Sequence, residues 1–105
     1  MDCPPRIAFH GLEPSDSLRL LVERRLAKLE LAYPRITSCR VAIEQPHRHH
    51  RRGGVWHVNV RVGVPGDEIA VSREAERGGR HRDAAAAVRD AFDAVRRQLN
   101  DRAER

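Results

Sequence analysis

The sequence predicts an α+β domain in which a four-stranded mixed sheet carries two helices packed on one face, in the order β-α-β-β-β-α. Three observations support this fold class. Apolar side chains recur at helical spacing in two segments, and they alternate with polar side chains in four shorter segments. The strand, helix, strand start implies a right-handed crossover and a parallel first pair. At 105 residues the chain has the length of one domain, residues 1–105.

The first two elements are a strand over residues 6–10 and a helix that begins after Ser15. Ile7 and Phe9 alternate with polar residues in the strand. Ser15 is a suitable N-cap, and Pro34 stops the helix. Five leucine and valine side chains share one stripe of this helix and are predicted to face the core: Leu18, Leu21, Val22, Leu26 and Leu29.

Three further strands follow. Residues 36–44 and 56–64 alternate at period two, and a returning strand around Ile69 and Val71 follows Pro65-Gly66, which suits the centre of a type II turn. The last two strands therefore form a hairpin. Cys39 and Trp56 share the parity of the buried valines and are predicted to pack in the core as a reduced thiol and an apolar ring. The opposite face, with Arg40, Glu44, His57, Asn59 and Arg61, is left for water or a partner.

A second helix ends the chain. Residues 77–82 are predicted as a loop and Asp83 as the N-cap. The spacing of Asp93 and Arg97 indicates an ion pair that supports the helix surface. The predicted inward stripe consists of Val88, Ala91, Phe92, Val95 and Leu99.

The charge indicates a polyanionic partner. The formal net charge is +5, and Lys28 is the only lysine among the 20 basic residues. Guanidinium groups match phosphate oxygens, so the surface suits nucleic acid. No acidic residue occurs between Gln45 and Gly66. No segment is apolar enough to span a membrane and the N-terminus has no signal pattern, so a cytoplasmic protein without membrane contact is predicted.

Catalytic motifs are absent from the sequence. There is no Cys-x-x-Cys, no glycine motif that would cradle phosphate before a helix, and no serine in a nucleophile-elbow context. We therefore predict that the protein is not an enzyme and needs no cofactor.

Both helices resemble those of a known family. The segment Glu13-Pro14-Ser15-Asp16-Ser17-Leu18-Arg19, then Val22, residues 25–30 and Arg35-Ile36, is similar to the first helix and second-strand start of the ribosome hibernation promoting factor and ribosome-associated translation inhibitor family, also called the sigma-54 modulation protein family. In the second helix, Asp83, Ala87-Val88, Asp93, Val95 and Arg97-Gln98-Leu99 carry the resemblance. Departures are Ala85, Ala94 and the segment Asn100-Asp101-Arg102, where the family usually has Tyr, Lys and a Lys-rich tail.

The resemblance implies a factor that binds the small ribosomal subunit near the decoding channel and silences translation by occluding messenger and transfer RNA. Ribosomal RNA is then the partner of the basic helix residues. Arg25, Lys28 and Arg97 match family bases, and Arg24, Arg89 and Arg96 are further candidates on the same helices. A generic basic RNA-binding domain without ribosome specificity is the alternative. Whether the chain forms a homodimer stays open.

The loop between the second and third strands has three competing interpretations. Arg48, Arg51 and Arg52 could reach ribosomal RNA as an arginine and histidine finger. His47, His49 and His50 could instead share a transition metal, an alternative disfavoured because the neighbouring arginines repel cations. The third interpretation is an ordinary hairpin loop.

Overall fold

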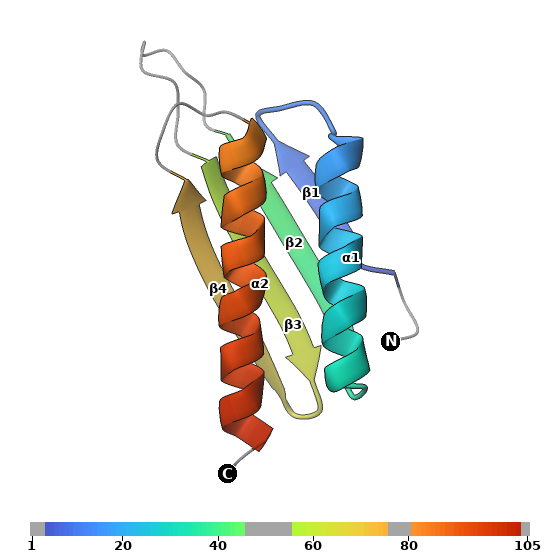
Figure 1. Ribbon diagram of the computed structural model, residues 1–105. Coiled ribbons are helices and arrows are strands. Elements are labelled where there is room, and N and C mark those ends of the chain that lie inside the picture. Colours follow the sequence, from blue (N-terminus) through green and yellow to red (C-terminus); the bar gives the residue numbers. More distant parts are fainter. Residues whose placement is uncertain (1–3, 46–55, 76–80, 104–105) are drawn as a thin grey trace.

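The computed structural model describes residues 4–45, 56–75 and 81–103. Its elements follow the predicted order, and the α+β class is confirmed (Figure 1). The strands lie side by side in the order β1-β2-β3-β4, with β1 parallel to β2 and the other neighbours antiparallel. The element bounds are β1 (Arg6–His10), α1 (Asp16–Ala32), β2 (Ser38–Glu44), β3 (Trp56–Val64), β4 (Asp67–Ala75) and α2 (His81–Ala103).

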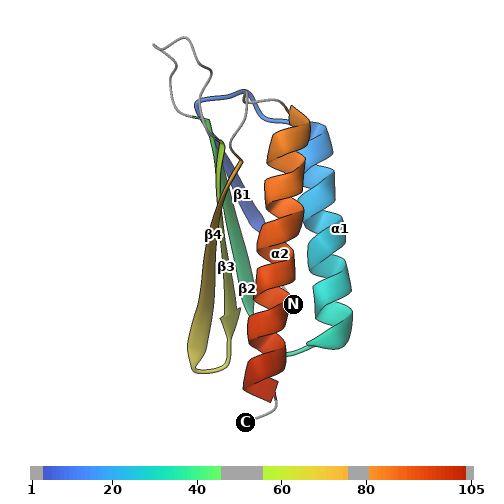
Figure 2. The same ribbon diagram turned by 60° about the vertical axis from the view of Figure 1, so that its left-hand side comes forward.

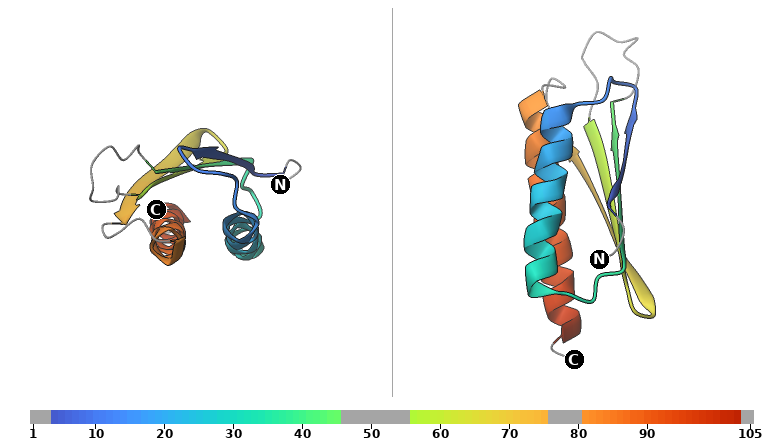
Figure 3. Two further views of the ribbon diagram at one scale, coloured as in Figure 1. Left: turned by 90° about the horizontal axis from the view of Figure 1, so that it is seen from above. Right: turned by 90° about the vertical axis from the view of Figure 1, so that its right-hand side faces the viewer.

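Both helices cover the same face of the sheet, so the domain has two layers (Figure 2). They lie side by side and run in the same direction, with both N-termini at one end of the domain (Figures 1 and 3). Neither helix of the described residues covers the opposite face of the sheet (Figure 3). Among the described residues, the buried core between the layers contains hydrophobic side chains and no charged one.

The start of α1 follows the sequence prediction closely. The hydroxyl oxygen of Ser15 accepts a hydrogen bond from the backbone N–H of Leu18 at 3.2 Å, which satisfies one of the free donors of the first turn. Four residues of the predicted stripe are buried: Leu18, Val22, Leu26 and Leu29. Leu21 is half-buried and packs at the edge of the core.

Gly11 joins β1 to the rest of the chain in a conformation that other residues rarely adopt. Its φ is +79°, and a Cβ atom there would lie 2.0 Å from the backbone oxygen of Gln45. The backbone N–H of Gln45 donates to the carbonyl of His10 at 2.9 Å. Glycine is therefore required where the ends of β1 and β2 meet.

The core prediction for the sheet is confirmed. Cys39 and Trp56 are 3% and 4% exposed, and the inward valines of β3 are buried beside them. Burial, and secondarily the charge of Glu30, raises the pKa of the Cys39 thiol to about 12. The thiol is therefore neutral and unreactive near pH 7.

Three predicted boundaries were wrong. α2 begins at His81 rather than after Asp83, because neither His81 nor Arg82 opposes helix formation as glycine or proline would. β2 begins at Ser38 rather than at residue 36, since the Ile36 N–H bonds back to the Tyr33 carbonyl at 3.3 Å and closes a turn. β4 is longer than predicted because it pairs with the whole of β3.

Candidate nucleic-acid interface

A groove between α1 and α2 gathers basic side chains from both helices. It has a volume of about 150 Å³. Seven residues line it: Arg25, Lys28, Leu29, Ala32, Phe92, Asp93 and Arg96.

Helical register places these cations. Arg25 and Lys28 are three residues apart and therefore lie on one side of α1, next to the buried stripe. Arg96 follows the buried Phe92 by four residues on the side of α2 that faces α1. The helices run side by side (Figure 1), and basic residues of both line the same groove.

One carboxylate, that of Asp93, lines the groove beside the three cations and pairs with Arg25. Asp93 Oδ1 lies 3.5 Å from an Arg25 guanidinium nitrogen, and the Arg25 side chain is only 31% exposed. In the described ranges, no carboxylate pairs with Lys28 or Arg96. The groove therefore holds two uncompensated positive charges. The predicted pairing of Asp93 with Arg97 is wrong, because Asp93 points across to α1 instead.

The floor of the groove is apolar. Leu29 and Phe92 are buried and form its base. Aliphatic stems of long basic side chains can lie along such a surface while their charged ends stay in water. This arrangement directs the cationic ends of Lys28 and Arg96 outward, where they can donate to phosphate oxygens.

The structure separates the predicted site residues into groups. Arg25, Lys28 and Arg96 meet at the groove. Arg89 lies seven residues before Arg96 and therefore on the same side of α2. Arg24 and Arg97 are exposed but do not line the groove. The loop candidates lie outside the described residues: Arg48, Arg51, Arg52, His47, His49 and His50.

Arg97 was predicted from the family resemblance, whereas its neighbour Arg96 is the residue that faces α1. Successive residues of a helix are about 100° apart around its axis. The signal in the sequence was the position of Arg96 four residues after the inward Phe92. Arg96 was predicted only as a further candidate beside Arg25, Lys28 and Arg97.

Membrane-spanning helices and metal-binding clusters are both absent from the described residues. No helix within the described segments is long and apolar enough to cross a membrane. No group of three or more histidine, cysteine, aspartate or glutamate side chains in residues 4–45, 56–75 and 81–103 could hold a metal ion. The histidine loop lies outside those residues, so its metal hypothesis is untested.

The sequence profile of the family described as "Sigma 54 modulation protein / S30EA ribosomal protein" matches residues 6–105. The chain belongs to this family. The family assignment agrees with the resemblance predicted from the two helices. No curated protein matches the sequence of this family member.

Solved structures with the same fold include two relatives of low sequence identity. A ribosomal subunit interface protein from Coxiella burnetii superimposes with a TM-score of 0.74 at 18% identity, covering 95% of this chain and 97% of that one. The N-terminal domain of Protein Y from Thermus thermophilus gives a TM-score of 0.68 at 22% identity, covering 92% and 96%. At such identities these matches establish the fold of this S30EA family member.

Proposed function

We propose that residues 1–105 act as one ribosome-associated domain that binds the small ribosomal subunit near the decoding channel and silences translation by occluding messenger and transfer RNA. Family membership supports the ribosome as partner. The name of the Coxiella burnetii relative, a ribosomal subunit interface protein, is consistent with that partner.

The observation that carries the proposal is the pair of uncompensated cations in the interhelical groove. Lys28 and Arg96 project from different helices onto one groove, and Asp93, the one carboxylate among the described residues that line it, is engaged by Arg25. Ribosomal RNA presents rows of phosphates, and each cation that neutralises a phosphate releases counterions into solution. The groove is therefore the part of the helical face where RNA binding should be most sensitive to substitution.

The test is cosedimentation of the chain with isolated small subunits, isolated large subunits and whole ribosomes across a salt series. The double variant Lys28→Gln with Arg96→Gln should bind small subunits more weakly. The slope of log affinity against log salt should become shallower by about two, because two phosphate contacts are lost. Translation in a cell-free system should recover in parallel.

A matched double variant controls for net charge. Arg19→Gln with Arg35→Gln also removes two positive charges, from residues outside the groove. It should retain the wild-type salt slope. Equal losses in both double variants would contradict a groove-specific contact. If the wild-type chain binds free structured RNA as tightly as it binds small subunits, the protein is a generic RNA-binding domain instead.

A further inference from the structure

The outer face of the sheet carries a row of three arginines that the helical groove does not involve. Arg6 of β1 pairs in register with Arg40 of β2, and Arg40 pairs in register with Arg61 of β3. Residues in register share one face of a sheet, and adjacent strands are about 4.8 Å apart. The three side chains therefore start from one line across the sheet, about 10 Å long.

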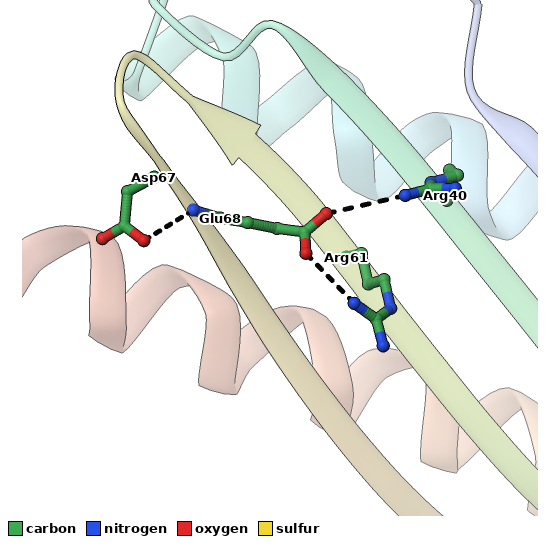
Figure 4. Close-up of polar contacts among 4 residues, drawn as sticks. All are labelled: Arg40, Arg61, Asp67 and Glu68. Atoms are coloured by element: carbon green, nitrogen blue, oxygen red, sulfur yellow. Dashed lines mark hydrogen bonds and ion pairs between the residues drawn. The ribbon is translucent and has the colours of Figure 1, made fainter.

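Three like charges in a row would repel one another, and one carboxylate relieves part of this repulsion. The Glu68 carboxylate lies between two guanidinium groups, at 3.0 Å from Arg61 and 3.7 Å from Arg40 (Figure 4). The arginine side chains stay 54% and 60% exposed. In the described part of the chain no carboxylate pairs with Arg6. The row keeps two net positive charges.

Asp67, the residue before Glu68, anchors the start of β4. The Asp67 side chain accepts a hydrogen bond from the Glu68 backbone N–H at 2.7 Å (Figure 4). The other Asp67 oxygen accepts a hydrogen bond from Arg102 of α2 at 2.6 Å. These contacts tie the start of β4 to α2, and the Glu68 carboxylate is placed by its ion pairs with Arg40 and Arg61.

A hollow lies directly beside the arginine row. The next outward row across β1, β2 and β3 consists of Ala8, Ala42 and Asn59, which are short side chains. Together with the three arginines they surround a depression of about 330 Å³. Ser72 Oγ donates to Asn59 Oδ1 at 2.5 Å, so this bond leaves the amide N–H groups of Asn59 unused.

We propose that this face binds the phosphates of a nucleotide, with the arginine row holding adjacent phosphate groups and the alanine-floored hollow receiving the attached sugar or base. Arginine matches phosphate oxygens in a bidentate manner, and a row about 10 Å long exceeds one phosphate but fits two or three in succession. The nucleotide can come from a free nucleoside polyphosphate or from a single-stranded RNA segment, and both present the same chemistry.

No phenylalanine, tyrosine or tryptophan ring lies on this face among the described residues, because Trp56 is buried on the inner side. The outward His10 and His57 lie one row beyond the hollow and do not line it. Base stacking on large aromatic rings is therefore not the main source of affinity. Charge and phosphate geometry dominate, and the ligand must displace water from a shallow hollow. Affinity should consequently depend on phosphate number more than on base identity.

The experiment uses the free full-length chain at 0.15 M salt, without ribosomes, and a fluorescently labelled nucleoside diphosphate as probe. Saturable binding is expected, with inorganic pyrophosphate competing and an uncharged nucleoside failing to compete. Amide chemical shifts should move in β1, β2 and β3. A single-stranded tetranucleotide that binds more tightly than the diphosphate identifies RNA as the source, whereas equal or weaker binding identifies the free nucleotide.

Variants test the separate roles of the arginines, the hollow and Glu68. Arg40→Gln with Arg61→Gln should weaken probe binding at least about tenfold, since it removes two charge-assisted contacts. Ala42→Leu should also weaken binding although the charge is unchanged, because it fills the hollow. Glu68→Gln should tighten binding several-fold by releasing both guanidinium groups. Far-UV circular dichroism checks that each variant is folded.

Two controls separate this proposal from the ribosome proposal. Arg35→Gln removes one exposed charge outside this face and should leave probe binding unchanged. Lys28→Gln with Arg96→Gln should lose ribosome affinity but keep nucleotide binding. Absence of saturable binding would overturn the proposal. So would equal loss in the Arg35→Gln control, shifts confined to the helices, or displacement of the probe by a short poly-glutamate peptide.

Discussion

The interhelical groove and the arginine row are two basic surfaces on opposite sides of the sheet, and they balance their charges differently. In the groove, one carboxylate engages Arg25 and leaves two cations free. On the sheet, Glu68 contacts two arginines and leaves Arg6 free. Each surface keeps two net positive charges, but only the sheet face divides one carboxylate between two guanidinium groups.

Their floors differ more than their charges. The groove is floored by Phe92 and Leu29, which belong to the hydrophobic core. The hollow beside the arginine row is floored by Ala8 and Ala42, which face outward. Substitutions in the groove floor should therefore lower the free energy of unfolding, whereas substitutions in the floor of the sheet hollow should change it little.

The largest expected effect comes from the groove floor. Phe92→Ala should lower the free energy of unfolding by about 3–5 kcal/mol, because it deletes a buried ring. Ala42→Val, on the floor of the sheet hollow, should change it by less than about 1 kcal/mol, since Ala42 is half-buried, faces away from the core and lies in a strand, where valine is favoured. Urea unfolding measures both. Similar losses for the two variants would remove the distinction between the floors.

The next largest effect is expected at Gly11, which follows the strand that carries Arg6 of the arginine row. Gly11→Ala should destabilise the fold by about 2 kcal/mol or more, because alanine disfavours the +79° φ angle and its Cβ would meet the Gln45 oxygen. β1, which carries Arg6, should loosen first. Hydrogen exchange of the β1 and β2 amides reports this opening.

Gly66→Ala provides a control for the preceding substitution. Gly66 has the same φ of +79°, yet a Cβ atom there would meet nothing within 4 Å. Only the backbone penalty applies, so a loss of about 1 kcal/mol is expected. If both glycine variants lose the same stability, the contact with Gln45 is unimportant.

A smaller effect distinguishes two adjacent arginines. Arg96→Gln should reduce affinity for small subunits by up to about tenfold and lower the salt slope by about one. Arg97→Gln, which alters a residue outside the groove, should do less in the same cosedimentation assay. A larger effect of Arg97 would favour the family-based assignment over the groove.

The smallest effect concerns the core between the two surfaces. The folded state favours the neutral thiol of Cys39, whose pKa rises from 9.0 to about 12. The stabilisation from this group is therefore complete below pH 9 and is lost as the pH rises through about 12. The difference in unfolding free energy between wild type and Cys39→Ala should stay constant from pH 6 to 8 and shrink above pH 9. A constant difference up to pH 11 would contradict the raised pKa.

Sequence periodicity was sufficient to predict the element order and the core. The parity of Trp56 with the valines of β3 and the spacing of Leu18 and Leu29 follow from the geometry of a single strand or helix. The boundary that failed at Ile36 depends on a hydrogen bond to the Tyr33 carbonyl, which periodicity does not encode. The boundary at Asp83 failed because a favourable N-cap residue type does not exclude an earlier helix start.

The two basic surfaces were only partly predictable. The face of Arg40 and Arg61 follows from parity, but their alignment with Arg6 depends on the register between separate strands. Similarly, the meeting of Lys28 with Arg96 depends on the rotation of α2 against α1. Strand register and helix rotation are set by tertiary packing. The basic residues could therefore be predicted from the sequence, but not which of them lie together.

The shared direction of the two helices gives the domain an electrical polarity. Neighbouring antiparallel helices largely cancel their dipoles, but α1 and α2, with 17 and 23 residues, start at the same end (Figure 1). Each helix contributes about half a positive charge at its N-terminus and about half a negative charge at its C-terminus. The dipoles therefore add, and near a polyanion the domain experiences a torque that turns the common N-terminal end of its helices toward the polyanion.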